Sequence, residues 1–269
     1  MVLSNKRDNF LDIMKGVAII LVIIGHNIQF GSGLSFYETA SYYENVIFRF
    51  IYSFHMPLFM MISGYFFYFS IKKYSARELI KSKIKSLLIP VLCWSIIPIA
   101  LLFLKIILNH KGFQIDFIFN CLKIILCNLW FLWAILYCSM IVLFNSKFFN
   151  DSIFVYFLLL VLCFFIPDDL NFSLYKYMYP YFVFGYFANK KEWLTKLQSL
   201  LKNKKISLIY LLINAILYTF LFLNFNSTSY IYTSKMNVLG KIEIEIIEIA
   251  IFRWIIGFVG SILILSIIY

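Results

Sequence analysis

Eight apolar segments constrain what this chain can fold into more than any other feature of its sequence. A helix that crosses the hydrocarbon core of a bilayer needs about 20 mostly apolar residues, because its backbone polar groups must be bonded within the segment. The candidate segments are 10–30, 47–70, 87–108, 128–145, 152–166, 174–189, 206–224 and 246–269. The sequence therefore predicts an all-α polytopic transmembrane helix bundle, folded as a single integral-membrane domain over residues 1–269.

Composition supports this class of protein and gives no sign of a soluble domain. Hydrophobic residues make up 62% of the chain and charged residues only 14%, whereas roughly a quarter of a soluble domain is charged. The fifth and sixth segments are short, and Pro167 and Pro180 lie near them, so we expect these helices to be tilted, broken or re-entrant. Residues 113–127 form an amphipathic stretch that we expect to lie along the membrane interface.

The distribution of basic residues predicts the orientation of the chain. If the N-terminus is cytoplasmic, most lysines and arginines outside the spans fall on the cytoplasmic side, as the positive-inside rule requires. We therefore expect eight crossings with both termini in the cytoplasm, and a multi-pass location in a bacterial inner membrane. The formal net charge of +11 follows from this bias, so that nucleic-acid binding is the weaker interpretation. The five cysteines lack metal-type spacing, and we expect no metal site or disulfide framework.

The first segment carries an ionisable stripe. At about 100° per residue, the step from Lys15 to His26 is three turns plus about 20°, so both side chains share one face, roughly 16.5 Å apart along the axis. Asp12 and Lys15 form an i, i+3 pair. Ionisable groups at membrane depth usually mark functional sites. The alternatives are that Lys15 snorkels to the interface with Asp12 as its counter-ion, and that His26 is a hydrogen-bonded structural residue.

Other polar groups are expected at the depth of His26. His55 lies about 12 Å inside the second segment, and Pro57 after it leaves a backbone carbonyl without its helical partner. Trp130 opens the fourth segment, where an interfacial aromatic belt explains it equally well. Arg253 lies in the outer half of the last segment, where structural pairing and function are equally compatible with its burial. Together these residues predict a polar chamber in the outer half of the bundle.

Several phrases, in this order, resemble the membrane acyltransferase family 3, and in particular the fucose 4-O-acetylase-like O-acetyltransferases of bacterial surface polysaccharides. They are Arg7-x4-Asp12-x2-Lys15-Gly16-x9-His26, FHMPLFMMISGYFF (54–67), a basic stretch ending in KSLLIP (85–90), LWFLWAILY (129–137) and YPYFVFGYF (179–187). Many members have Arg in place of Lys15, and a lysine lacks the planar fork that grips carboxylate or phosphate. Members usually have more spans, so we expect either a short member or one that lacks C-terminal helices.

The resemblance implies transfer of an acetyl group from cytoplasmic acetyl-CoA to a hydroxyl of a cell-surface glycan or lipid-linked saccharide, within membrane lipid and without a metal. The basic loop 71–86 would hold the CoA phosphates, and the pantetheine arm would follow the face from Lys15 to His26. The residues expected to contact acetyl-CoA are Arg7, Asp12, Lys15, Lys72, Lys73, Arg77 and Lys81.

We expect His26 to act as the general base. His55 would share the proton transfer, orient His26 or stabilise the oxyanion, and Arg253 is a further candidate for stabilising negative charge. Trp130 is expected to contact the acceptor. Ser63 suits close helix packing and is not assigned as a nucleophile. Two other functions remain open: a transporter or flippase for lipid-linked saccharides, and a non-catalytic membrane subunit or sensor.

Overall fold

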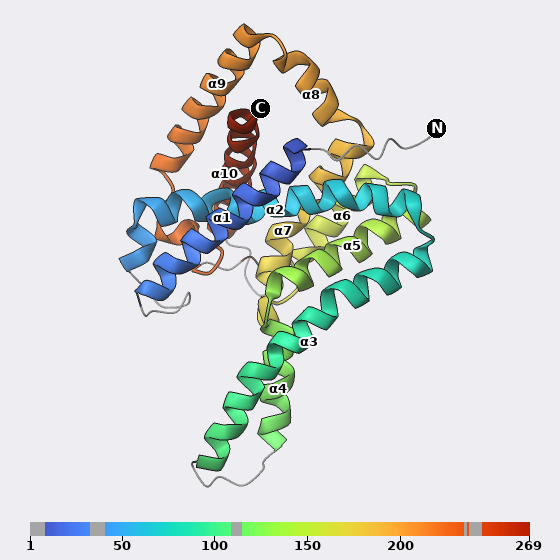
Figure 1. Cartoon of the computed structure of the whole chain (residues 1–269), viewed down its shortest axis with the longest axis vertical. Helices are drawn as coiled ribbons and strands as arrows, with labels where there is room; N and C mark the ends of the chain where they lie inside the picture. Colours follow the sequence, from blue (N-terminus) through green and yellow to red (C-terminus); the bar gives the residue numbers. More distant parts are fainter. Residues whose placement is uncertain (1–8, 33–40, 109–114, 234–235, 237–243) are drawn as a thin grey trace.

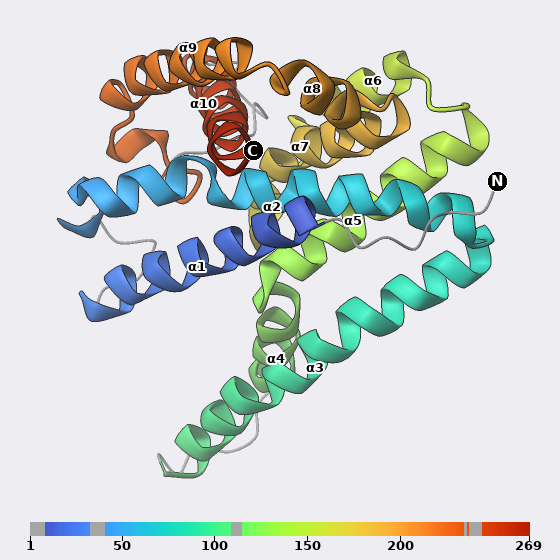
Figure 2. The ribbon, with the colours of Figure 1, turned by 45° about the horizontal axis from the view of Figure 1, so that its top comes forward.

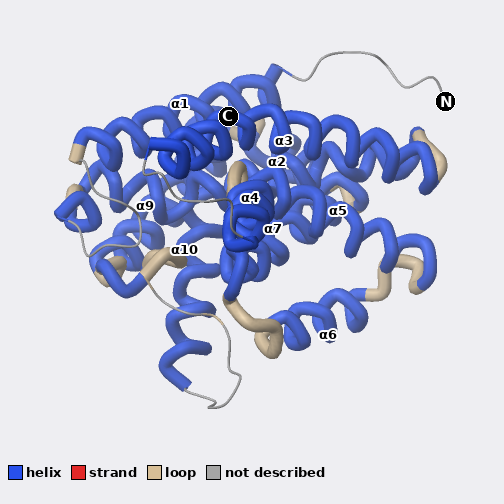
Figure 3. The backbone as a smooth tube through the Cα atoms, turned by 90° about the horizontal axis from the view of Figure 1, so that it is seen from below, coloured by secondary structure: helices blue, strands red, loops and turns tan. Residues whose placement is uncertain are grey.

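The computed structural model describes residues 9–32, 41–108, 115–233, 236 and 244–269. These residues form helices joined by turns, and no strand occurs among them (Figure 3). The helices are α1 (Asn9–Gly31), η1 (Ser41–Glu44), α2 (Val46–Lys73), α3 (Ala76–Leu108), α4 (Ile115–Cys127), α5 (Trp130–Phe148), α6 (Ile153–Cys163), η2 (Asp169–Asn171), α7 (Phe172–Lys190), α8 (Trp193–Leu201), α9 (Lys204–Leu223), η3 (Ser227–Ser229) and α10 (Ile244–Ile268) (Figure 1). The all-α prediction is therefore confirmed for the described chain.

Helix α2 lies at the centre, between α1 on one side and α7 and α10 on the other (Figure 2). One apolar core, which includes Phe67 and Tyr181, lies between α2, α5 and α7. A second, which includes Phe48 and Phe54, lies between α1, α2, α9 and α10. Because α2 contributes to both cores, its position fixes the relative placement of the other helices.

The outer surface is apolar, as expected of helices that contact lipid. Isoleucine and leucine side chains on α1, α3 and α9 are exposed, which is unfavourable in water and favourable in hydrocarbon. Six helices in the described chain are long and apolar enough to cross a membrane: α1, α2, α3, α5, α9 and α10. The protein is thus a multi-pass membrane protein.

All eight predicted segments are helical, but the helices in two of them, 152–166 and 174–189, are not among the six that are long and apolar enough to cross a membrane. Helix α6 has 11 residues and ends at Cys163, before Pro167. Helix α7 has 19 residues and runs unbroken through Pro180, so of the three alternatives expected for it, a break does not occur. Most of the α7 surface is buried among its neighbours. This burial explains why its many tyrosines are compatible with a central position in the bundle.

The prediction of a basic loop over 71–86 is wrong, because α2 and α3 cover most of this segment and meet in a tight turn. Only Tyr74 and Ser75 separate the two helices. Ser75 caps α3: its Oγ accepts from the backbone N–H of Glu78 at 3.3 Å, while its own N–H donates to Glu78 Oε2 at 3.0 Å. This Ser-x-x-Glu capping box starts α3 within the basic stretch. The basic side chains therefore stand on helix ends.

Helices α3 and α4 form a hairpin that projects from the rest of the molecule (Figure 1, Figure 2). Phe103 of α3 contacts Phe117 of α4, with ring centroids 6.2 Å apart. The amphipathic segment expected over 113–127 is thus a helix, although its expected position along the interface stays a prediction.

The first and last helices of the described chain, α1 and α10, meet at one end of the bundle. The ring of Phe10, at the start of α1, meets that of Tyr269 with centroids 6.3 Å apart. The Tyr269 hydroxyl donates to the carbonyl of Gln198 in α8 at 2.7 Å. The start of α1, the end of α10 and the basic α8 segment therefore share one end, in agreement with an arrangement that places them on the same side of a membrane.

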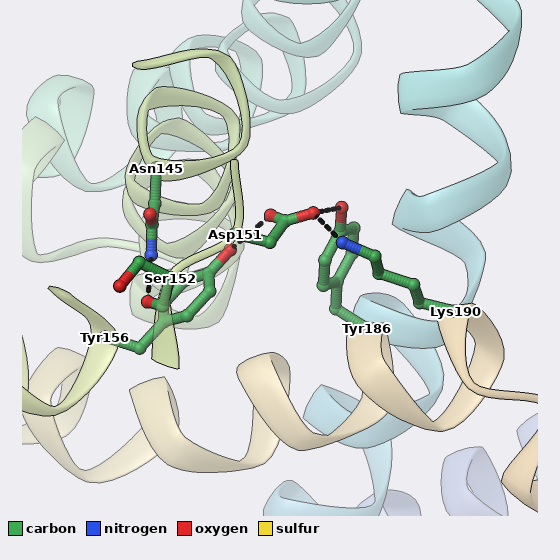
Figure 4. Close-up of polar contacts among 6 residues, drawn as sticks. All are labelled: Asn145, Asp151, Ser152, Tyr156, Tyr186 and Lys190. Carbon is green, nitrogen blue, oxygen red and sulfur yellow. Dashed lines mark hydrogen bonds and ion pairs between the residues drawn. The ribbon is translucent and has the colours of Figure 1, made fainter. Parts of the chain in front are cut away.

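At the turn between α5 and α6, Asp151 binds three side chains (Figure 4). Its Oδ2 pairs with the Lys190 ammonium and accepts from the Tyr186 hydroxyl at 2.9 Å, while Oδ1 accepts from the Tyr156 hydroxyl at 3.0 Å. Asn145 donates from Nδ2 to the Ser152 carbonyl at 3.1 Å. These contacts tie α5, α6 and α7 together.

A second ion pair lies at the start of α7. Lys176 has 3% of its side chain exposed and donates to Asp168 Oδ1 at 2.7 Å. The second carboxylate oxygen of Asp168 accepts from the backbone N–H of Met236 at 2.7 Å. Buried charges need such partners, and Asp168 supplies one for Lys176.

Candidate active site

A cavity of about 620 Å³ opens between α1, α2 and the turn that joins α4 to α5. His26, His55 and Trp130 all line it, so the structure brings together three of the predicted site residues. The other lining residues are Ile19, Val22, Ile23, Phe30, Tyr52, Met56, Phe59, Cys127, Asn128, Leu129, Phe131 and Tyr232. The walls are mainly apolar, and His26 and His55 are the two imidazole groups among them.

The α1 wall follows the stripe expected from the sequence. Ile19, Val22 and His26 lie four, seven and eleven residues after Lys15, so all four share one face of the helix. Gly25 permits the close approach of α1 to α2 at this depth, since a Cβ atom there would lie 2.6 Å from Cε2 of Tyr52. Because residue 25 is a glycine, the turn of α1 that carries His26 can pack against the Tyr52 ring of α2.

His55 is almost fully buried, with 2% of its surface exposed. Its Nδ1 lies 2.8 Å from the carbonyl oxygen of Ile51, and only a protonated Nδ1 can donate to that acceptor. In the neutral ring, Nε2 is then the acceptor nitrogen. The Tyr52 ring stands edge-on to the imidazole, with centroids 4.6 Å apart, which restricts its rotation.

His26 is less buried than His55 and lies on the opposite wall. Its ring stacks on Phe30, with centroids 5.7 Å apart and an interplanar angle of 22°. The His26 imidazole is therefore held by an aromatic neighbour on its own helix and faces the same cavity as His55.

The third wall is the α4–α5 turn, which the sequence did not identify as part of the site. Leu129 has a φ of 45°, a left-handed conformation that is uncommon outside glycine. Asn128 holds the turn by donating from Nδ2 to Ser95 Oγ of α3 at 3.0 Å. Its Oδ1 accepts from the backbone N–H of Leu129 at 3.0 Å. Asparagine before the aromatic LWFL phrase was the only sequence signal for this turn.

Cys127 is the other group in this turn with potential chemistry. Burial raises the pKa of the Cys127 thiol, and the nearby Lys123 lowers it by less. A protonated thiol is a poor nucleophile. The cysteine therefore contributes to the cavity wall, and the two imidazoles are the better candidates for proton transfer.

Arg253 does not line this cavity. It is 1% exposed and donates from Nε to the Ser229 carbonyl at 2.8 Å and from Nη2 to the Tyr230 carbonyl at 3.3 Å. These bonds fix the backbone just before Tyr232, which does line the cavity. Of the two interpretations left open by the sequence, the geometry favours structural pairing.

The residues expected to bind the cofactor lie away from the cavity, toward the end of the bundle that contains the start of α1. Lys15 Nζ is 3.4 Å from Asp12 Oδ1 and 3.7 Å from the centroid of the Phe66 ring, so it is packed between α1 and α2. The α2–α3 turn presents four exposed cations, Lys72, Lys73, Arg77 and Lys81. Arg7 lies outside the described residues. The binding roles of all these residues stay predictions.

The arrangement can support acid–base chemistry on a substrate in the cavity. Two imidazoles from different helices face one largely apolar space, where charge interactions are stronger than in water. Within the described ranges, no three His, Cys, Asp or Glu side chains are grouped as metal ligands.

Comparisons with known proteins agree with this picture. The acyltransferase domain family, Acyl_transf_3, matches residues 8–269. The chain is 32% identical over 192 residues to nodulation protein NolL of Mesorhizobium japonicum, which covers 71% of this chain and 50% of the relative. It is 30% identical over 214 residues to nodulation protein NolL of Sinorhizobium fredii, which covers 76% of this chain and 54% of the relative. The chain thus spans about half the length of these relatives, and no solved structure matches it significantly. The match over almost the whole chain shows that it belongs to the acyltransferase 3 family.

Proposed function

We propose that this protein transfers an acetyl group from acetyl-CoA to a hydroxyl of a cell-surface polysaccharide or its lipid-linked precursor. The observation that carries the proposal is the shared cavity of His26 and His55 in a member of an acyltransferase family. Ionisable side chains within a membrane are energetically costly and therefore usually mark functional sites. Two of them at one cavity suit a reaction that moves a proton.

The donor would enter from the basic end of the bundle. We assign this end to the cytoplasm of a bacterial cell, because Lys72, Lys73, Arg77 and Lys81 would obey the positive-inside rule there. Lysine and arginine bind phosphate through charge and hydrogen bonds, so these residues suit the CoA phosphates. The pantetheine arm would then follow the α1 face for the roughly 16.5 Å between Lys15 and His26.

In the cavity, His26 would take the proton of the sugar hydroxyl as its oxygen attacks the thioester carbonyl. The carbon–sulfur bond then breaks, the acetyl group stays on the sugar oxygen, and the imidazolium returns the proton to the CoA thiolate. General-base catalysis of this kind contributes about 10²- to 10⁴-fold. The neutral tautomer of His55 has no N–H left to stabilise an oxyanion, so it suits an acceptor or orienting role.

The test is acetyl transfer in isolated membranes, with labelled acetyl-CoA and polysaccharide freed of its own esters by mild alkali. His26→Ala should lower the rate at least about 100-fold while the protein remains inserted. Asn27→Ala, at the exposed next position of α1, is the matched control and should retain activity. Near-normal transfer by His26→Ala would remove this residue from the mechanism, and saccharide movement without acetyl-CoA would favour a transporter.

A further inference from the structure

A second cavity, of about 570 Å³, lies beside the first turn of α2. It is formed by the N-terminal end of α2 and by the chain that follows α9. Its lining residues are Tyr43, Glu44, Arg49, Leu223, Asn224, Phe225, Asn226 and Ser227. Unlike the cavity of the two histidines, this one is mainly polar, and none of its lining residues takes part in the mechanism described above.

Arg49 is the central group of this second cavity. Its Nη2 donates to the Phe222 carbonyl at 3.2 Å and to the Phe225 carbonyl, which fixes the guanidinium plane. Its Cζ lies 5.0 Å from the centroid of the Phe222 ring. The Nε atom is buried and has no hydrogen-bond partner among the described residues. A buried donor without a partner is unfavourable, so Arg49 has hydrogen-bonding capacity that the described residues leave unused. The guanidinium lines the cavity and is the charged donor that a ligand there would contact.

The chemistry of the lining indicates the class of ligand. Arg49 and Glu44 balance each other in charge, Asn224 and Ser227 provide groups that both donate and accept, and Tyr43 supplies a ring. An uncharged compound rich in hydroxyl groups uses all of these. A phosphate would be opposed by the Glu44 carboxylate. We propose that this cavity binds an uncharged sugar unit of the acceptor saccharide, an inference that rests on the proposed function.

The position of the second cavity suits a sugar unit away from the one that reacts. Arg49 and His55 are six residues apart on α2, about 9 Å along the helix axis. The Phe48 ring stacks on Tyr52, with centroids 3.9 Å apart, and meets the Tyr43 ring edge-on, with centroids 5.9 Å apart. A saccharide of several units is long enough to cover this separation, so one unit would lie beside Arg49 while another reaches the histidines. Binding energy from remote units can support the reaction at the reactive one.

The first experiment measures binding without requiring acetyl transfer. Ser227→Cys places a thiol at the exposed rim of the second cavity, where the rate of modification by a membrane-impermeant maleimide is measured in isolated membranes. De-esterified polysaccharide should slow this modification at least about fivefold. Ser41→Cys, exposed in η1 outside the cavity lining, is the control and should react equally fast with and without the polysaccharide.

The outcomes separate this inference from the proposed function. Protection of Ser227→Cys in a protein that transfers no acetyl group would support the sugar site and contradict the acetyltransferase. Unchanged modification in a protein that does transfer acetyl would overturn the sugar site alone. Protection by inorganic phosphate, with none by the polysaccharide, would also overturn the assignment to a sugar.

The second experiment is kinetic. Arg49→Gln and Glu44→Gln should each raise the KM for polysaccharide about tenfold, because a hydrogen bond to a charged group is lost. The KM for acetyl-CoA should stay within about twofold, since the donor site lies elsewhere. Arg49 also anchors the end of α9, whereas Glu44 is exposed, so Glu44→Gln keeps the test valid if Arg49→Gln fails to fold. Equal changes in both KM values would contradict the inference.

Discussion

Replacing Gly64 by alanine tests the packing on which the whole fold depends. A Cβ atom at Gly64 of α2 would lie 2.0 Å from the carbonyl oxygen of Phe182 in α7, and one at Gly185 of α7 would lie 1.9 Å from the carbonyl oxygen of Met61 in α2. Each glycine therefore faces the backbone of the other helix. Small residues at helix crossings let backbones approach in this way in membrane proteins.

The magnitude follows from the size of the clash. Real Cβ atoms essentially never come within 3.0 Å of such an atom, so α2 and α7 must separate by about 1 Å or more at their crossing. Overpacking of this kind costs up to about 3 kcal/mol. The higher helix propensity of alanine returns about 1 kcal/mol. We expect a net loss of about 2 kcal/mol, roughly a 30-fold change in the folding equilibrium.

The assay is thermal unfolding of the detergent-solubilised protein, followed by the loss of monodisperse material on size-exclusion chromatography. Gly64→Ala and Gly185→Ala should each lower the Tm by roughly 4–8 °C. Gly16→Ala in α1 is the matched control, because no atom lies within 4 Å of a Cβ built there. If Gly64→Ala and Gly185→Ala unfold at the temperature of the parent or above it, as expected for Gly16→Ala, the close crossing of α2 and α7 is refuted.

Three further substitutions test other parts of the structure. Lys15→Ala should raise the KM for acetyl-CoA by about tenfold with little change in Tm; an unchanged KM would leave Lys15 a structural residue. Arg253→Met should destabilise the protein by about 2–3 kcal/mol, because two buried backbone carbonyls lose a charged donor, and a Tm equal to that of the parent would contradict this role. Asp151→Asn should cost about 1–3 kcal/mol by the loss of its bond to Lys190, whereas exposed Asn150→Asp should be nearly neutral by the same thermal assay.

The sequence predicted the helices well because their length and polarity are local properties. A run of about 20 apolar residues has few alternatives in a membrane, so every expected segment is helical. The separation of Lys15 and His26 on one face likewise follows from helix geometry alone. The convergence of His26, His55 and Trp130 on one cavity could be anticipated because ionisable groups on different spans gain by meeting.

The parts that could not be predicted depend on contacts between distant segments. Helix α7 was expected as one of the short apolar spans, and only its packing against α2 through Gly185 and Gly64 places it at the centre. The sequence left the role of Arg253 open, and its carbonyl partners lie 23 and 24 residues earlier in the chain. The turn at Leu129 closes the cavity through a bond from Asn128 to Ser95, which no local pattern specifies.

These long-range contacts explain how one helix serves two cavities. Tyr52 fits against α1 only because Gly25 has no side chain, and its ring then restrains His55 while stacking on Phe48. Three residues before Tyr52, about 60° around α2, Arg49 holds the end of α9. The first turns of α2 are thus fixed by contacts with both α1 and α9. A rigid segment of this kind is what a transfer reaction needs, because small misplacements of reacting groups reduce the rate strongly.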